Sequence, residues 1–139
     1  MDFDLCGEVS KKKIISVSEN KMNFRIRNKH LVSIRTVTVD GCLINDKRLR
    51  CDYLFEIGAP CNYVIYLELK GCDVKKALKQ LESTIQACTK RHASMQKSCY
   101  VIASRVPKIG TKIQALKKKF VLKNLASLTV CTTKDEVVL

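Results

Sequence analysis

Residues 63–67 are aromatic, β-branched or aliphatic at every position, so this stretch has no polar face. The pattern predicts a strand over 63–71 that lies inside a sheet covered on both faces. Glu68 and Lys70 are two positions apart, which places both side chains on one face at the end of the strand. Charged groups in that position are costly unless they have a partner or a function.

A second strand is predicted directly before it, over residues 50–57. The residues between the two strands, 58–62, favour a turn because they include glycine, proline and asparagine. A hairpin centred on Pro60 places Asp52 opposite Glu68, with about 5 Å between their Cβ atoms. Two carboxylates this close repel each other unless a cation lies between them, so the pair is a candidate metal site.

After Gly71 the apolar residues recur at helical spacing. The helical stripe comprises Val74, Leu78, Leu81, Ile85 and Cys88. Asp73 is the expected N-cap, and the stripe is expected to pack on the sheet. Residues 99–103 predict another buried strand, and a strand–helix–strand connection of this length favours parallel pairing. A second helix is predicted over 112–123, followed by a closing strand over 128–131.

The N-terminal part predicts short strands over residues 14–17, 24–26 and 31–39, the last ending at an Asp-Gly turn. These strands form an antiparallel meander that leads into the hairpin. The whole order predicts an α/β fold (mixed α+β), with a mixed central sheet flanked by helices. A chain of 139 residues is long enough for one core, so residues 1–139 are expected to form a single domain.

The order Asp52, hairpin, Glu68, leucine, Lys70 and helix resembles the signature of the PD-(D/E)xK nuclease superfamily. The resemblance covers residues 50–103, and Cys51 stands where the family name has proline. It implies a restriction-endonuclease-like core in which Asp52 and Glu68 bind Mg²⁺ (or Mn²⁺). Lys70 would then be catalytic, orienting the attacking water or neutralising charge on the phosphate. The alternative is a salt bridge from Lys70 to either carboxylate, with no metal.

Four further residues are weaker candidates for the same site. Relatives often add a glutamate from an N-terminal helix, and here Glu8 is the nearest candidate and Glu19 the next, although neither lies on a convincing helix. Asp40 is a candidate if its strand end reaches the site, but an Asp-Gly pair is more often only a turn. Some relatives place a polar residue on the following helix, where this chain has Gln80. A solvated glutamine is the simpler interpretation.

Basic residues outnumber acidic residues by 26 to 13, which gives a formal net charge of +13. Such an excess favours an anionic partner, and nucleic acid (DNA or RNA) is the expected one. Lys112, Lys117, Lys118 and Lys119 lie in the second predicted helix and are candidate phosphate contacts. The simpler interpretation of this run is a solvated helix face.

The eight cysteines are not expected to form a disulfide framework. The N-terminus is acidic and lacks the apolar run of a signal peptide, and no C-x-x-C pair suggests zinc. The cysteines in or beside apolar segments are therefore expected to be small buried hydrophobes in a reducing compartment. They are Cys42, Cys51, Cys61, Cys88, Cys99 and Cys131. No stretch approaches a membrane span, so we expect a soluble cytoplasmic protein with no membrane contact. His30 and His92 are expected on the surface.

These features predict a metal-dependent nuclease-like protein that hydrolyses phosphodiester bonds of nucleic acid. The alternative is a non-catalytic nucleic-acid-binding or assembly subunit that retains the nuclease fold. A nuclease domain that acts as a homodimer or only with a partner protein is a third interpretation, since no residue specifies a target.

Overall fold

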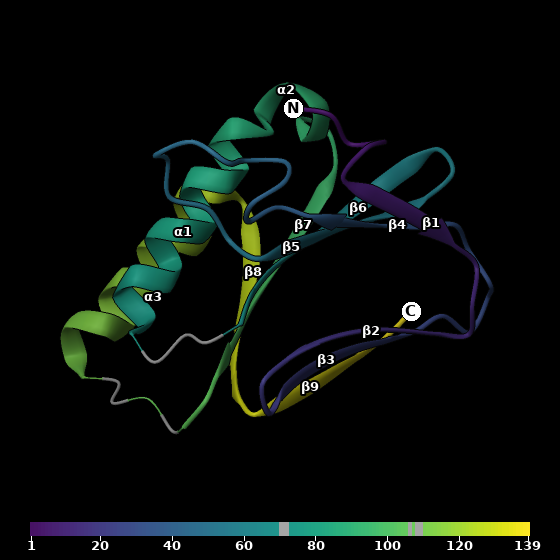
Figure 1. Cartoon of the computed structure of the whole chain (residues 1–139). Helices are drawn as coiled ribbons and strands as arrows, with labels where there is room; N and C mark the ends of the chain where they lie inside the picture. Colours follow the sequence, from purple (N-terminus) through teal and green to yellow (C-terminus); the bar gives the residue numbers. More distant parts are fainter. Residues whose placement is uncertain (70–72, 106, 108–109) are drawn as a thin grey trace.

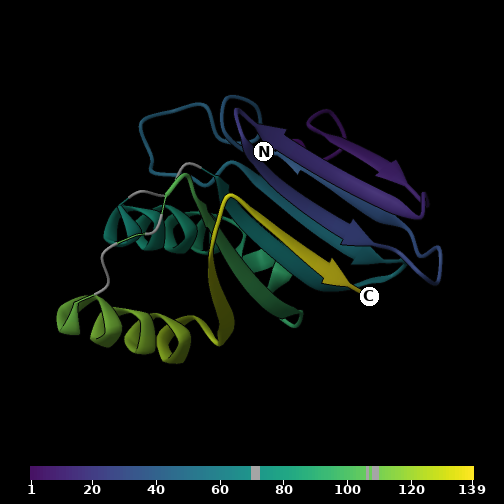
Figure 2. The ribbon, with the colours of Figure 1, turned by 90° about the horizontal axis from the view of Figure 1, so that it is seen from below.

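The structure, a computed structural model, describes residues 1–69, 73–105, 107 and 110–139 of the chain. Its strands are β1 (Gly7–Ser10), β2 (Ile14–Glu19), β3 (Met22–Arg27), β4 (Ile34–Thr38), β5 (Tyr53–Gly58), β6 (Cys61–Leu69), β7 (Gln96–Ala103), β8 (Ala126–Thr132) and β9 (Lys134–Val138). Its helices are α1 (Val74–Ala87), α2 (Thr89–His92) and α3 (Thr111–Asn124). The elements form three layers, with helices on one face of a large sheet and a small sheet on the other (Figures 1 and 2).

The large sheet is mixed, as the sequence predicts. Its strand order is β1-β4-β5-β6-β7-β8, in which β1, β4, β5 and β6 pair antiparallel, whereas β6, β7 and β8 pair parallel. The opposite face from the helices is covered by the sheet β2-β3-β9. This second sheet is not predicted by the sequence, which indicates helices as the covering elements.

Strand β6 is buried on both faces, which confirms its interpretation as an internal strand. Val64 and Tyr66 belong to the apolar core beneath the helices. Ile65, Leu67 and Leu69 point the other way, into the core between the two sheets. All five side chains are fully buried. Because successive side chains alternate between faces, a strand with core on both sides is apolar throughout, and the polar Glu68 is the exception that requires an explanation.

The β5–β6 hairpin turns where the sequence predicts it. Strand β5 ends at Gly58, whose φ of 100° is a conformation that glycine adopts easily. A cis peptide bond joins Ala59 to Pro60, and β6 begins at Cys61. The first strand begins at Tyr53 and not at residue 50, because the preceding residues form a loop beside α1.

The helices follow the predicted apolar stripes. In α1 the side chains of Val74, Leu78, Leu81 and Ile85 are buried, and the carboxylate of Asp73 accepts a hydrogen bond from the Lys76 backbone amide at 3.1 Å. Strand β7 pairs parallel with β6 after this helix, as predicted. None of the helices in the described parts of the chain is long and apolar enough to cross a membrane.

The N-terminal strands form the predicted meander only in part. Strands β2 and β3 do pair as an antiparallel hairpin, but they belong to the second sheet, whereas β4 joins the large sheet beside β5. Strand β9 completes the second sheet by pairing parallel with β3. The sequence does not predict β9, because its five residues include a lysine and two acids and are partly exposed.

One pair of cysteines departs from the prediction of free thiols. Cys6 and Cys42 form a disulfide, whereas Cys51, Cys88 and Cys99 are free and buried as expected. The two bonded residues are 36 positions apart, and they meet because β1 pairs with β4. This pairing places the segment that precedes β1, which contains Cys6, beside the turn that follows β4, which contains Cys42. Disulfides persist mainly in oxidising compartments, so a cytoplasmic location stays a prediction.

Candidate active site

Asp52 and Glu68 are cross-strand neighbours, which confirms the predicted hairpin geometry. Tyr53 pairs with Leu67, and the Asp52 amide donates to the Leu67 carbonyl at 3.1 Å, which extends this register by one residue. The Leu69 amide in turn donates to Asp52 Oδ2 at 2.8 Å. The two carboxyl groups lie within hydrogen-bonding reach of each other on the face of the sheet that the helices cover.

The environment of this pair disfavours two negative charges. The Glu68 side chain is only 6% exposed, and its burial, followed by the charge of Asp52, raises the pKa of Glu68 to about 9. Burial also raises the pKa of Asp52. Glu68 Oε1 is buried and has no hydrogen-bond partner within the described residues. Near neutral pH Glu68 is therefore protonated beside Asp52.

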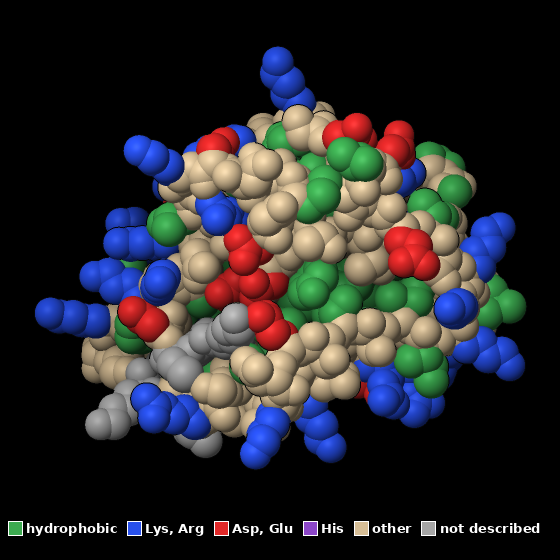
Figure 3. All heavy atoms as spheres, viewed as in Figure 1, with side chains coloured by type: hydrophobic (Ala, Val, Ile, Leu, Met, Phe, Trp, Pro, Cys, Tyr) green, Lys and Arg blue, Asp and Glu red, His purple; other side chains and the backbone are tan. Residues whose placement is uncertain are grey.

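Two further acids intensify the negative potential. The charge of Asp40 raises the pKa of both members of the pair, and the charge of Glu19 raises that of Asp52. Asp40 is held close because its backbone amide donates to the Asp52 carbonyl at 3.3 Å. Figure 3 shows a group of acidic side chains near the middle of the view, with other acidic side chains scattered over the surface and most lysine and arginine side chains around the outline. These acids lie close together although the chain as a whole has a net charge of +13.

A cleft of about 280 Å³ opens beside Asp52. Its lining residues are Asp40, Lys47, Arg48, Leu49, Arg50, Asp52, Lys76 and Gln80. The Gln80 amide donates to the Arg50 carbonyl at 3.3 Å, and Arg50 Nε forms an ion pair with Asp40 Oδ1 at 2.9 Å. Gln80 is therefore a half-buried part of the cleft wall, not a solvated residue. Asp40 and Gln80, both weak candidates from the sequence, are brought to the site.

Other predicted residues are not brought to this cleft. Glu8 pairs with Thr36, which pairs with Phe55, so Glu8 lies on the sheet face opposite to the helices. Lys112 and Lys118 are exposed on α3 and do not line the cleft. Lys117 and Lys119 do not line it either. Lys70, the predicted catalytic lysine, lies outside the described residues.

Lys76 is a member of the cleft wall that the sequence interpretation missed. Lys76 and Gln80 are four residues apart on α1, so they lie on the same face of the helix. This spacing was a signal that the helix presents two polar side chains toward the site beside its apolar stripe. Lys76 supplies a positive charge at the edge of the acidic group.

A second buried carboxyl lies at the other end of the same sheet face. Glu56 is 5% exposed, and it accepts hydrogen bonds from Arg91 Nε at 2.7 Å and Nη2 at 2.9 Å. His92 Nε2 lies 2.6 Å from Glu56 Oε2, and His92 Nδ1 lies 2.6 Å from the Tyr66 hydroxyl. Burial would raise the pKa of Glu56, but the hydrogen bonds from His92 and Arg91 outweigh it and lower this pKa to about 2.

The surface position predicted for His92 is wrong, because its side chain is fully buried. Both of its ring nitrogens have partners, and this satisfaction is what allows a polar ring inside the core. His30 is exposed, as predicted. The polar residues around His92 in the sequence suggested solvent, but they lie at the edge of the short helix α2 while the ring points inward.

Asp52 and Glu68 are the residues of this site that could hold a magnesium or manganese ion. Mg²⁺ prefers oxygen ligands and keeps several waters, so two carboxylates are enough to hold it. Glu68 Oε1, which lacks a partner in the described part of the chain, is an oxygen that a cation would satisfy. Across the described residues, no group of three or more His, Cys, Asp or Glu side chains is arranged to hold a metal ion.

Comparison of the chain with protein-family models, with curated proteins and with solved structures finds no match in any of the three.

Proposed function

We propose that this protein is a metal-dependent nuclease-like protein that hydrolyses phosphodiester bonds of nucleic acid. The observation that carries the proposal is the buried Oε1 of Glu68 beside Asp52, which has no hydrogen-bond partner among the described residues. The order of β5, β6, α1 and β7 also follows the strand–hairpin–strand–helix arrangement that the PD-(D/E)xK resemblance implies. The net charge of +13 supports a polyanionic substrate.

The residues of the proposed site divide into metal ligands, a catalytic lysine and phosphate contacts. Asp52 and Glu68 would hold Mg²⁺ or Mn²⁺, and the Leu69 amide fixes the Asp52 carboxylate through its hydrogen bond. A bound cation of this kind polarises a phosphodiester and lowers the pKa of an attacking water. Lys70, on sequence grounds, would orient that water or neutralise charge developing on the phosphate. Lys76 and Gln80 line the cleft and would contact a phosphate group there.

A non-catalytic nucleic-acid-binding or assembly subunit is the second candidate. The observation in its favour is that the raised pKa of Glu68, about 9, lets the pair share one proton and remain buried without a cation. In that case the carboxyl pair is a structural hydrogen bond left in a nuclease-like fold. The two candidates differ in whether a divalent cation replaces this proton and whether cleavage follows.

A cleavage assay with matched variants separates the two candidates. Purified protein would be incubated with single- and double-stranded DNA and RNA, with Mg²⁺ or Mn²⁺ and with EDTA. We expect metal-dependent cleavage that EDTA abolishes and that Glu68→Gln and Lys70→Ala each reduce by about a thousandfold or more. Circular dichroism and thermal unfolding would confirm that each variant is folded.

Glu136→Gln is the matched control, because it makes the same chemical change at an exposed position of β9, on the second sheet. Its cleavage rate should stay within about twofold of wild type, as for most surface changes. A Glu68→Gln protein that still cleaves at the wild-type rate would refute the proposed site. Wild-type protein that binds all four substrates but cuts none would establish the non-catalytic candidate.

A further inference from the structure

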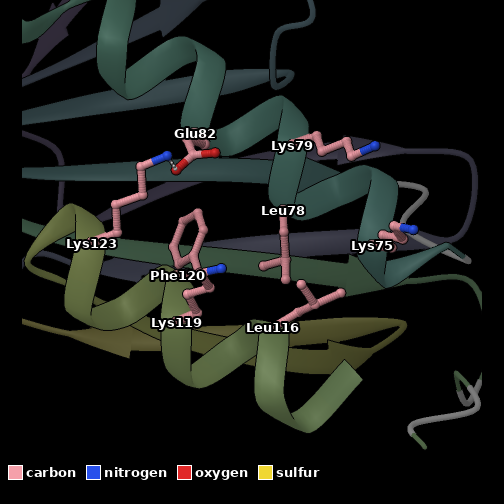
Figure 4. Close-up of a pocket in the computed structure, with 8 residues that line it drawn as sticks. All are labelled: Lys75, Leu78, Lys79, Glu82, Leu116, Lys119, Phe120 and Lys123. Atoms are coloured by element: carbon pink, nitrogen blue, oxygen red, sulfur yellow. Dashed lines mark ion pairs between the residues drawn. The ribbon is translucent and has the colours of Figure 1, made fainter. Parts of the chain in front are cut away.

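A groove separate from the acidic cleft lies between α1 and α3. It has a volume of about 230 Å³, and its apolar floor is made by Leu78, Leu116 and Phe120 (Figure 4). These side chains also hold the two helices together, because Phe120 is buried against the core that α1 covers. The floor is thus fixed by the fold and is not an accidental gap between mobile side chains.

Lysine side chains form both rims of this groove. Lys75 and Lys79 come from α1, whereas Lys119 and Lys123 come from α3. Lys123 forms an ion pair with Glu82 at 3.1 Å across the two helices, and this pair bounds one end of the groove (Figure 4). The ion pairs found among the described residues include none with Lys75, Lys79 or Lys119. Three positive charges therefore surround an apolar floor without an acidic partner from the described residues.

Helix α1 connects the groove to the acidic cleft. Lys76 and Gln80 line the cleft, whereas Lys75 and Lys79 line the groove. The residues of each pair are one helical turn apart, and the two pairs are offset by one residue, or about 100° around the helix axis. The two depressions therefore lie on neighbouring faces of one helix. A ligand chain that leaves the cleft over α1 would follow the helix surface for roughly 10 Å to reach the groove.

We propose that this groove binds a single-stranded segment of nucleic acid next to the cleft, an inference that rests on the proposed function of the cleft. A single strand exposes phosphates and base faces together, whereas a duplex keeps its bases stacked inside. The lysine rims match the phosphates, and the apolar floor, of which Leu116 is the partly exposed member, matches the apolar face of a base. The substrate class would accordingly be single strands, or duplexes with a single-stranded extension.

Binding without metal tests the groove by charge reversal. Anisotropy of a labelled 12-nucleotide oligo-dT would be measured in EDTA for wild type, Lys79→Glu/Lys119→Glu and the control Lys12→Glu/Lys21→Glu. Both double variants change the net charge equally, and all four lysines are exposed, but only the first pair lines the groove. We expect the groove variant to bind about tenfold or more weakly and the control to lose about threefold at most. The slope of log affinity against log salt concentration should become shallower by about 1 more in the groove variant than in the control variant.

A tryptophan probe tests base contact directly, because the chain contains no tryptophan. Leu116→Trp places the only indole in the groove, and Leu122→Trp places it on the exposed side of α3, where Leu122 is 76% exposed. Oligo-dT should quench the fluorescence of the groove tryptophan by stacking and leave the control tryptophan unchanged. Equal quenching of both would overturn the assignment.

Two further outcomes separate this inference from the proposed nuclease activity. Glu68→Gln should retain wild-type binding of oligo-dT in EDTA, because the groove does not use the carboxyl pair. A blunt duplex that binds as tightly as oligo-dT, or equal loss of affinity in the two double variants, would overturn the groove. If the protein binds oligo-dT through the groove but never cleaves, the groove assignment is supported and the nuclease proposal is refuted.

Discussion

Two buried glutamates on one face of the large sheet have opposite protonation. Glu56 of β5 and Glu68 of β6 are 5% and 6% exposed, and both lie on the face that the helices cover. The pKa of Glu56 is lowered to about 2, whereas the pKa of Glu68 is raised to about 9. Burial alone therefore does not determine the charge of a carboxyl group. The charge is determined by the groups that surround each glutamate at its end of the sheet.

The difference indicates which end has a structural role and which end is the candidate site. Glu56 receives hydrogen bonds from Arg91 and His92, and Arg35 lies 3.4 Å away, so its charge is compensated within the protein. Glu68 faces Asp52 and has an oxygen with no partner among the described residues. A buried carboxyl whose hydrogen bonds are satisfied stabilises the fold, whereas one left incomplete is typical of a site that a ligand completes.

The largest effect on stability is expected from Glu56→Gln. The variant leaves Arg91 and His92 without their carboxylate, and breaking a buried charged network typically costs several kcal/mol. Because Arg91 is partly exposed, we expect a loss of about 2–4 kcal/mol in the free energy of unfolding at pH 7. Urea unfolding followed by circular dichroism measures it. A loss of less than about 0.5 kcal/mol would show that the network is not structural.

The same variant has a defined pH dependence. The pKa of Glu56, about 2, lies below its ordinary value of 4.5, so its contribution is present above about pH 4.5 and is lost as the pH falls toward 2. The difference between wild type and Glu56→Gln should therefore shrink across this range. Arg27→Gln is a suitable control, because it removes an exposed ion pair with Glu136 and should change stability by about 0.5 kcal/mol at most.

A smaller effect of opposite sign is expected from Glu68→Gln. The pKa of Glu68 in the folded protein is raised to about 9, so its contribution is present below about pH 4.5 and is lost as the pH rises toward 9. The glutamine amide carries no charge and can donate to Asp52. Without divalent cations, the variant should therefore be more stable than wild type at pH 8 by about 1–3 kcal/mol, with little difference near pH 5.

Divalent cations should reverse this order, which gives a readout of the metal site that does not depend on cleavage. Excess Mg²⁺ or Mn²⁺ binds the native carboxyl pair and stabilises wild type by mass action, but it should stabilise Glu68→Gln much less. Thermal unfolding at pH 8 with and without the cation measures both proteins. Equal cation-induced shifts in the two proteins would contradict the assignment of Glu68 as a ligand.

The sequence predicts the hairpin that brings Asp52 opposite Glu68, because the signals for this hairpin are local. The turn residues around Pro60 determine the hairpin register, and the register determines that Asp52 lies opposite Glu68. The apolar stripe of α1 has helical spacing, so the layer that covers this pair was also predictable. The hairpin and the helix that covers it are therefore both specified by residues close to them in the sequence.

The remaining features depend on contacts between distant segments. The Cys6–Cys42 disulfide forms only because β1 pairs with β4, and no spacing in the sequence marks it. The His92 ring is buried by Glu56, 36 positions away, and by Tyr66, 26 positions away. A local polar environment in the sequence therefore says little about the side of a short helix that faces the core. The second sheet, which needs β9 to reach β3, was missed for the same reason.

The smallest expected effect concerns the hydroxyl group of Tyr66, which contacts His92 and so belongs to the network around Glu56. Tyr66→Phe removes the partner of His92 Nδ1 and leaves that buried nitrogen unsatisfied. The expected cost is about 1–2 kcal/mol in the free energy of unfolding.

Tyr63→Phe is the matched control, because Tyr63 donates to Ser98 Oγ at 2.8 Å and Ser98 keeps a second partner in Ser127. Its cost should be about 0.5 kcal/mol or less, since no buried group is left without a hydrogen bond. Urea unfolding at pH 7 measures both variants. Equal losses would mean that the histidine does not depend on the tyrosine, and that Arg91 and His92 alone hold Glu56 in its charged form.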